Sequence, residues 1–273
     1  MVTYFKALTV AGSDSGGGAG IQADLKTFAA LKVFGTSAIT SVTAQNTQNI
    51  LAIKYLPSSL IIQQINAVLS DIGANAIKTG LLGKPRVIRA VVKCLAAHPE
   101  IPLIIDPVMT STTGKTLVDA ETIEVLRNLL LPLAHVVTPN FPEAKALTGR
   151  RIETEADCQH AAEEIFQMGP KVVILKGGHV PKNLRSANEK VTDLYFDGNN
   201  FQKISGPYIP GETKHGTGCT FSAAITAGIA QGLSVLHATQ LARKYLTKTW
   251  INSFRVGRGR ASPLNHFYES WEA

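Results

Sequence analysis

Short apolar runs and longer amphipathic segments alternate along most of the chain. The apolar runs predict buried strands, and their ranges are 7–11, 35–43, 76–82, 102–106, 135–138 and 171–176. Apolar residues at helical spacing predict helices over 21–31, 58–72, 85–97, 120–130 and 155–168, with one more beginning near 139–143. Apolar strands that alternate with helices are typical of a parallel sheet covered on both faces. The pattern therefore predicts the α/β class.

The last third of the chain follows a different pattern. The runs 193–196 and 201–204 flank a polar turn and predict a hairpin. We expect 180–204, which also contains a polar segment, to act as a mobile lid. Two long helices, 217–232 and 235–254, complete the chain. Because no linker, low-complexity segment or repeat interrupts the pattern, we expect a single domain over 1–273.

Basic residues outnumber acidic ones. The chain has 27 lysines and arginines against 20 aspartates and glutamates, a net charge of +7, and this balance suits anionic ligands. No five basic residues follow one another, and no aromatic residues alternate with them as a base-stacking surface requires. We therefore expect a small-molecule substrate and no nucleic acid as partner.

The cysteines and the apolar runs indicate the compartment. Cys94, Cys158 and Cys219 are far apart and form no CxxC pair, so neither a zinc site nor a disulfide framework is indicated. The run 7–11 is too short for a signal peptide, and no run approaches the ~20 residues of a membrane span. We therefore expect a cytoplasmic protein without membrane association.

The stretch 215–220, HGTGCT, leads into a long helix of small residues. Its two glycines allow a tight turn, after which the N–H groups and the positive end of the helix dipole face an anion. On the first helical turn, Cys219 is expected to lose its proton more easily than an ordinary thiol. The alternative is a glycine turn before a core helix that contains a buried cysteine.

A second glycine-rich stretch, 12–20, connects the first strand to the first helix. This layout is typical of phosphate and dinucleotide loops. However, the Gly-Lys-Ser/Thr ending is absent and the glycines do not fall as GxGxxG. We expect the loop to let a small ligand approach the backbone.

Polar residues follow the carboxyl ends of the predicted strands, where open parallel sheets bind ligands. They are Asp14, Gln45, Lys78, Asp106, Asn140, Glu143 and Lys176. Taken singly, several have a structural explanation, such as a cap, a turn or a solvated strand end. Together they indicate one site, in which Asp106 and Glu143 hold Mg²⁺ through waters and Lys176 neutralises phosphates.

These motifs resemble those of the hydroxymethylpyrimidine and phosphomethylpyrimidine kinases of the ribokinase superfamily. The resemblance covers nearly the whole chain and is most specific in 12–27 and 215–220. It implies a three-layer α/β/α, ribokinase-like fold, a homodimer, and the use of ATP and Mg²⁺. The implied reaction phosphorylates 4-amino-5-hydroxymethyl-2-methylpyrimidine and then its monophosphate, for thiamine diphosphate synthesis.

The resemblance also implies roles for individual residues. The pyrimidine pocket would contain Ala19, Asp24, Thr43, Gln45, Leu81 and Cys219. Asn140 and Glu143 would lie near Mg²⁺ and the phosphates, with Lys176 and Thr213 at the nucleotide. Three positions depart from the usual family pattern: Gly16 replaces a serine, Leu81 a methionine, and Arg243, expected at the phosphates, a lysine.

Phosphoryl transfer requires positioning and charge stabilisation more than covalent chemistry. The N–H groups of Gly216, Thr217, Gly218 and Cys219 would hold the transferring group, and Gln45 would pair with the aminopyrimidine edge. We hypothesise that Cys219, as a thiolate, accepts the hydroxymethyl proton. The nearest alternative is a pyridoxal kinase of the same superfamily. More distant ones are a non-catalytic phosphate or nucleic-acid binder and a cysteine hydrolase, for which His215 is not a convincing partner.

Overall fold

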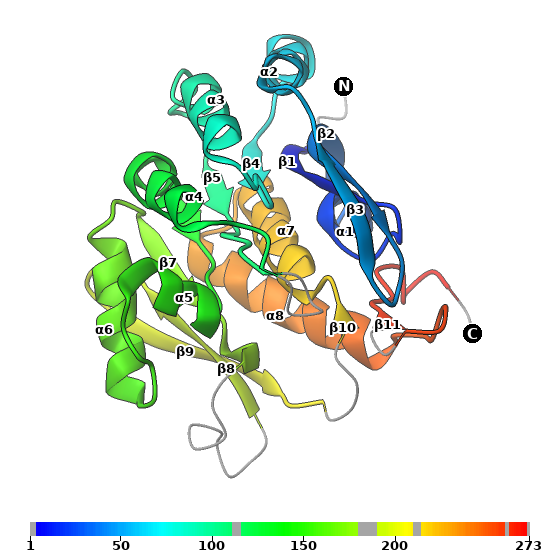
Figure 1. Cartoon of the computed structure of the whole chain (residues 1–273). Coiled ribbons are helices and arrows are strands. Elements are labelled where there is room, and N and C mark those ends of the chain that lie inside the picture. Colours follow the sequence, from blue (N-terminus) through cyan, green and yellow to red (C-terminus); the bar gives the residue numbers. More distant parts are fainter. Residues whose placement is uncertain (1–3, 111–115, 180–189, 210–213, 260–261, 272–273) are drawn as a thin grey trace.

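A computed structural model describes residues 4–110, 116–179, 190–209, 214–259 and 262–271 of the chain. Within them, one sheet contains nine strands in the order β3-β2-β1-β4-β5-β6-β7-β8-β9 (Figure 1). The strands are β1 (Lys6–Asp14), β2 (Phe34–Gln45), β3 (Ile50–Tyr55), β4 (Ala76–Thr79), β5 (Leu103–Ile105), β6 (Val136–Val137), β7 (Val172–Leu175), β8 (Lys190–Phe196) and β9 (Phe201–Pro207). Neighbours from β2 to β7 are parallel, whereas β3, β8 and β9 pair antiparallel at the two edges. The predicted mostly parallel sheet is confirmed.

Helices cover both faces of this sheet (Figure 1). One face carries α2 (Ser58–Ala67), α3 (Pro85–Leu95), α4 (Ala120–Val125), α5 (Phe141–Thr148) and α6 (Glu155–Phe166), and the other carries α1 (Gly20–Ala30), α7 (Thr217–Ala230) and α8 (Val235–Ile251). Successive strand residues alternate between the two cores: Ile104 belongs to the core under α7 and α8, and Leu103 and Ile105 to the other. The three-layer α/β/α architecture is confirmed. Among the described residues, no helix is long and apolar enough to cross a membrane.

Several elements differ from the prediction. The strand expected at 76–82 ends as β4 at Thr79, and the helix expected at 120–130 ends as α4 at Val125 and continues as a π-helical turn, Leu126–Leu130. Strand β3 was not predicted, because it lies at the edge of the sheet and does not alternate cleanly; Leu51, for example, is 72% exposed. The helix expected at 58–72 ends as α2 at Ala67 and continues as a π-helical turn, Val68–Ile72. Gly73, with a φ of 73°, ends that turn in a conformation that glycine adopts readily.

The predicted hairpin is formed by β8 and β9. The two strands extend the sheet beyond β7, and the rings of Phe196 and Phe201 stack with their centroids 4.2 Å apart. The second part of the expected lid therefore consists of strands of the main sheet. Residues 180–189 lie outside the described residues.

A segment near the C-terminus pairs with the short strand that precedes α7. β1 runs to Asp14, three residues beyond the predicted strand, and the glycine loop follows it. A short strand, β10 (Lys214–His215), leads into α7 and pairs in parallel with β11 (Ser262–Pro263) near the C-terminus. This small sheet holds His215 against the loop after β1.

Candidate active site

Two glycine loops meet at the carboxyl end of β1. One is the loop 15–19, and the other is the turn at Gly216 between β10 and α7. Gly216 has a φ of 84°, and a Cβ atom there would lie 1.8 Å from the carbonyl oxygen of Gly18. A Cβ atom on Gly18 would lie 2.5 Å from the ring of His215. The close approach of the two backbones therefore requires glycine at both positions.

The turn at Gly216 leaves the start of α7 without a side-chain cap. Thr217, Gly218 and Cys219 lie in its first turn, where N–H groups have no partner within the helix. The dipole adds partial positive charge at the same end. This is the local geometry of an anion site, and it agrees with the anion turn predicted from the sequence.

Asp14 holds the loop 15–19 in place. Its carboxylate accepts hydrogen bonds from the N–H groups of Gly16 (2.7 Å), Gly18 (3.0 Å) and Ala19 (2.9 Å), and Nε2 of His215 lies 2.8 Å from Oδ2. Burial alone would raise the pKa of Asp14, but His215 and the N–H groups of Gly16 and Ala19 together lower it. Asp14 is therefore an ionised carboxylate that joins the two loops.

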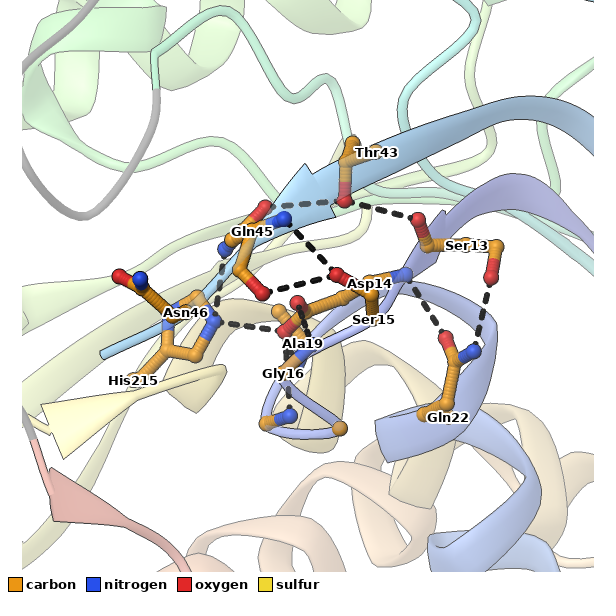
Figure 2. Close-up of polar contacts among 12 residues, drawn as sticks. Ser13, Asp14, Ser15, Gly16, Ala19, Gln22, Thr43, Gln45, Asn46 and His215 are labelled. Atoms are coloured by element: carbon orange, nitrogen blue, oxygen red, sulfur yellow. Dashed lines mark hydrogen bonds and ion pairs between the residues drawn. The ribbon is translucent and has the colours of Figure 1, made fainter. Parts of the chain in front are cut away.

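Gln45, at the end of β2, faces the same place (Figure 2). Its side-chain nitrogen lies 3.0 Å from Nε2 of His215, and its side-chain oxygen lies 3.3 Å from the hydroxyl of Thr43. The backbone of Gln45 is tied to Ser15, whose hydroxyl donates to the Gln45 carbonyl and accepts from its N–H, both at 2.8 Å. The half-buried amide is thus presented from a fixed backbone.

Of the remaining residues assigned to the pyrimidine pocket, Ala19 caps α1 and Leu81 follows β4. Both are half-buried. The carbonyl of Leu81 accepts a hydrogen bond of 2.7 Å from Thr40 on β2, so its backbone is anchored beside the sheet. A Cβ atom on Gly12 of β1 would lie 3.9 Å from the Leu81 side chain. The structure thus brings Leu81 to the neighbourhood of β1 and β2.

Asp24 is fully buried beneath these loops. It accepts a hydrogen bond of 2.6 Å from Thr9 and forms an ion pair with Lys78, which is also fully buried, at 2.9 Å. Burial raises the pKa of Asp24 although Lys78 and Thr9 oppose the rise, whereas the Asp24 carboxylate raises the pKa of Lys78 against burial. The direct contact of 2.9 Å stabilises both charges, so the pair is ionised. Asp24 therefore fixes the position of Lys78 beneath the loops, and its assignment to the pyrimidine pocket, which the resemblance implies, stays a prediction.

Cys219 is half-buried in the first turn of α7. Burial raises the pKa of its thiol to about 12; the carboxylates of Asp24 and Asp106 raise it further, while Lys78 and the N–H of Gly20 lower it. The expected acidification of this thiol is therefore wrong. One helix terminus does not offset burial beside two carboxylates.

Asp106, Lys176 and Glu143 form a charged group beside the first turn of α7. The ammonium of Lys176 lies 2.7 Å from Asp106 Oδ1 and 3.7 Å from Glu143 Oε2, and all three residues are buried. A Cβ atom on Gly218 would lie 3.4 Å from that ammonium. Burial raises the pKa of Glu143 to about 7, with Asp106 adding to the rise and Lys176 opposing it. In the described part of the chain, no three histidine, cysteine or acidic side chains converge as a metal cluster.

Asn140 and Glu143 form a capping box at the start of α5. The Asn140 side chain accepts from the N–H of Glu143 at 2.9 Å, and Glu143 Oε2 accepts from the N–H of Asn140 at 2.8 Å. This pattern satisfies two N–H groups that would otherwise lack partners. The Asn-x-x-Glu motif therefore has a structural function, and its predicted role near Mg²⁺ and the phosphates stays a prediction.

Arg243, on α8, pairs with Asp193 of β8. Its Nε donates to Asp193 Oδ2 at 2.8 Å, Nη2 contacts the same oxygen, and the guanidinium lies over the ring of Phe221. Asp193 Oδ1 accepts from the N–H of Gly177 at 2.9 Å. Arg243 thus supports the backbone next to Lys176, and its place at the phosphates, which the resemblance implies, stays a prediction. Thr213 lies outside the described residues.

Three residues of the site have partners that the sequence did not predict. Lys78 was expected at the site as a polar strand end, His215 as part of the glycine turn, and Asp193 as part of a hairpin. For Lys78 and His215 the signal was adjacency to a strand end or a glycine turn. Their contacts with Asp24 and Asp14 join residues 54 and 201 positions apart, so spacing along the chain does not reveal them.

Comparison with known proteins identifies the family that shares these features. A model of the phosphomethylpyrimidine kinase family matches residues 14–265. The chain belongs to this family. It is 44% identical, over 97% of this chain and 96% of the relative, to the hydroxymethylpyrimidine/phosphomethylpyrimidine kinase of Bacillus subtilis. The family members are kinases, and the predicted enzyme class is confirmed.

Two further similarities bear on substrate and fold. A thiamine biosynthetic bifunctional enzyme of Arabidopsis thaliana is 41% identical over 96% of this chain, which spans 50% of that longer protein. The Staphylococcus aureus pyridoxal kinase solved with AMP-PCP and pyridoxal is 34% identical, with a TM-score of 0.88 and coverage of 98% of this chain and 96% of that one. The fold is thus that of known small-molecule kinases of the ribokinase type.

Proposed function

We propose that this kinase transfers the γ-phosphoryl group of ATP to 4-amino-5-hydroxymethyl-2-methylpyrimidine and then to the monophosphate, in thiamine diphosphate synthesis. One observation carries the proposal: His215 contacts the Gln45 amide and is followed by the uncapped start of α7. The Gln45 amide, which can pair with a heterocycle, and the N-terminus of α7, which can bind phosphate, therefore lie close to each other. The names of relatives at 41–44% identity point to the same reaction.

The first turn of α7 would hold the phosphoryl group during transfer. The N–H groups of Thr217, Gly218 and Cys219 are oriented by the helix before any ligand binds, so they stabilise developing charge without reorganisation. Lys176 adds a positive charge close to Gly218. ATP as phosphoryl donor is supported by the AMP-PCP complex of the pyridoxal kinase.

Asp106 and Glu143 are the residues that would hold Mg²⁺. They fit a cation, because two buried carboxylates face a single ammonium: Lys176 Nζ lies 2.7 Å from Asp106 Oδ1 and 3.7 Å from Glu143 Oε2. One or two carboxylates, completed by waters and substrate phosphates, are a common set of Mg²⁺ ligands. When bound, the ion would neutralise charge on the phosphates.

We propose that Cys219 lines the site as a neutral thiol. With its pKa raised to about 12, it is protonated at neutral pH and is a poor base in the ligand-free protein. A loose phosphoryl-transfer transition state needs little removal of the acceptor proton before transfer. Positioning by Gln45 and α7 then supplies the catalysis.

The test is ADP release with Mg–ATP and three acceptors: the pyrimidine alcohol, its monophosphate and pyridoxal. We expect turnover of both pyrimidines. Lys176→Met should lower kcat by about a hundredfold or more, because it removes charge at the phosphates. Lys203→Met, which removes an exposed lysine paired with Glu155, should change kcat little. A folded enzyme that turns over pyridoxal but neither pyrimidine would contradict the proposal.

A pyridoxal kinase is the second candidate, favoured by the structural similarity to the pyridoxal kinase complex. Pyridoxal also presents a hydroxymethyl group on an aromatic heterocycle. Gln45 favours the aminopyrimidine instead, because its planar amide offers a donor and an acceptor side by side. The higher identity to the pyrimidine kinase, 44% against 34%, points the same way.

We also propose that the protein is a homodimer of single-domain subunits in the cytoplasm, with no nucleic-acid or membrane partner. Phe34, Val42 and Leu51 on the outer strands β2 and β3 are 56%, 44% and 72% exposed, which suits a subunit interface. The three cysteines form no disulfide, which suits a reducing compartment. Light scattering should give twice the 29.2 kDa chain mass, and a monomer at micromolar concentration would contradict the dimer.

A further inference from the structure

Four polar residues form a chain of contacts across the substrate side of the site (Figure 2). Asp14 Oδ2 lies 2.8 Å from Nε2 of His215, and the same nitrogen lies 3.0 Å from the Gln45 side-chain nitrogen. At its other end, the Gln45 amide lies 3.3 Å from the Thr43 hydroxyl, which also donates to the Ser13 carbonyl at 3.0 Å. The hydrogens in this chain determine which way the Gln45 amide points.

His215 Nε2 must carry a proton. Its neighbour Asp14 is an ionised carboxylate that receives three backbone N–H groups and can only accept hydrogen bonds. A bare ring nitrogen 2.8 Å from a carboxylate oxygen would place two lone pairs against each other. The N–H of His215 therefore points at Asp14, and Nε2 has no lone pair to offer Gln45.

An amide nitrogen facing that N–H would place donor against donor. At the other end of the amide, the Thr43 hydroxyl has one hydrogen and two acceptors, the Ser13 carbonyl at 3.0 Å and the Gln45 oxygen at 3.3 Å; donation along the shorter contact leaves the Thr43 oxygen to accept. A half-turn of the amide exchanges its nitrogen and oxygen and removes the donor–donor conflict at His215. The oxygen then lies beside the His215 N–H, and the NH₂ group donates to Thr43.

We propose that Asp14 and His215 set the polarity of Gln45, with its amide oxygen toward His215 and its NH₂ group toward Thr43, and that this polarity selects the substrate edge. His215 is thereby a positioning residue that acts through Gln45. The inference deepens the proposed function and rests on it. It predicts that the enzyme prefers a substrate whose ring edge presents a hydrogen-bond donor and an acceptor in one fixed order, such as an amino group beside a ring nitrogen, over a substrate with the two exchanged.

Three restraints keep His215 in position for this role. Its ring packs against Gly18, where a Cβ atom would lie 2.5 Å away. Its backbone belongs to β10, which pairs with β11 through His215 and Pro263. Gly216 then turns the chain into α7. A movement of the ring would therefore disturb both the loop after β1 and the start of the phosphate-binding helix.

Orientation is tested first without substrate. Long-range ¹H–¹⁵N NMR of the full-length protein should show a protonated Nε2 on His215 at neutral pH. The Gln45 NH₂ protons should show contacts to the Thr43 methyl group and none to the His215 ring. A non-protonated Nε2, or Gln45 NH₂ contacts to the His215 ring, would overturn the proposal whether or not the pyrimidine is a substrate.

Kinetics test the consequence. The acceptors are the aminopyrimidine alcohol and its 4-oxo analogue, whose ring edge has donor and acceptor exchanged. His215→Leu should raise KM for the aminopyrimidine about tenfold, with kcat within about threefold, and reduce discrimination against the 4-oxo compound about tenfold. His215→Gln keeps a side-chain N–H and should recover most of both. Equal losses for the two acceptors would indicate a merely structural role and overturn the proposal.

A double-mutant cycle separates action through Gln45 from general damage. If His215 acts through Gln45, His215→Leu should have little further effect on discrimination in a Gln45→Ala background. An undiminished effect there would contradict the mechanism. Failure of the wild-type enzyme to phosphorylate either pyrimidine would instead refute the proposed function, and the NMR result would still decide the orientation.

Discussion

At the scale of single residues, charged neighbours determine what Cys219 can do. The thiol lies at a helix N-terminus, which favours a thiolate, but it is crowded by protein and by the carboxylates of Asp24 and Asp106. Lys78 opposes them but is itself paired with Asp24. Burial therefore dominates, and the residue keeps its proton.

Alkylation measures this protonation state. In a Cys94→Ala/Cys158→Ala protein, we expect the rate of Cys219 modification by iodoacetamide to rise with pH without a plateau below about pH 10, because only the thiolate reacts. A protein that lacks Cys219 as well gives the background rate. A plateau of the rate near pH 7 or 8 would instead support the hypothesis that Cys219 acts as a thiolate base. Cys219→Ala should retain kcat within about tenfold.

Glu143 should make stability depend on pH. Its pKa is raised from 4.5 to about 7, so the folded state holds a proton that the unfolded state releases. Stability is therefore lost as pH rises from about 4.5 to 7, by up to about 3 kcal/mol. Glu143→Gln removes this loss and should be more stable than wild type above pH 7, with the two converging near pH 4.

Urea unfolding at pH 4.5, 6 and 8 checks this expectation. The variant keeps an oxygen that can accept from the N–H of Asn140, so the cap of α5 remains. Its kcat should fall because one proposed Mg²⁺ ligand is lost. A stability difference that does not change with pH would show that Glu143 is ionised in the folded state.

At the scale of elements, the start of α7 depends on a backbone contact between two loops. Gly216 and Gly232 lie at the two ends of the helix with similar φ values, 84° and 86°. An added Cβ atom would lie 1.8 Å from a backbone oxygen at Gly216 but would meet nothing within 4 Å at Gly232. Alanine substitutions at these two glycines therefore distinguish the strain of a left-handed backbone from a steric clash with a neighbouring loop.

Gly232→Ala should cost about 1–2 kcal/mol, the strain of a left-handed alanine, and leave activity nearly unchanged. Gly216→Ala should cost about 3 kcal/mol or more and lower kcat/KM strongly, because α7 and the loop after β1 must separate. Denaturant unfolding and steady-state kinetics on both variants test this. Equal destabilisation would show that the loops can move apart freely.

At the scale of the whole molecule, the C-terminal segment ties the two sides of the site together. Gly259 donates to Thr47 in the loop after β2 at 3.0 Å, and β11 pairs with β10 beside His215. Behind α7, His266 Nε2 lies 2.9 Å from the Thr220 hydroxyl, and the His266 carbonyl accepts from Tyr245 at 2.9 Å. These contacts connect the C-terminal segment to the loop after β2, to the strand before the Gly216 turn, and to α7 and α8.

His266, which belongs to this C-terminal segment, should make the stability of the protein sensitive to acid. Burial lowers its pKa from 6.5 to about 4, so only the unfolded state gains a proton as pH falls through this range. Up to about 3 kcal/mol of stability is therefore present above pH 6.5 and lost toward pH 4. His266→Gln should remove most of that loss when unfolding is compared at pH 7.5 and 5. His160→Gln, at an exposed histidine, is the control and should leave the slope unchanged.

Regular elements were predictable because their signals are local. Buried strands such as 102–106 and 171–176 are continuous apolar runs, and α3 repeats apolar residues at helical spacing. The exposed edge strand β3 lacks such a pattern and was missed. The glycine turn before α7 was also predictable, because glycines and a following helix are enough to define it.

By itself, the sequence determined the α/β class, the positions of most elements and the strand ends that carry the polar site residues. Each of these features depends on residues only a few positions apart. Only the tertiary structure decided the state of the site residues. Contacts between Asp14, Gln45 and His215 span 170 and 201 positions, and Cys219 keeps its proton because of carboxylates on α1 and after β5. Protonation and hydrogen-bond direction depend on burial and on charges within a few ångströms, and chain folding alone brings those together.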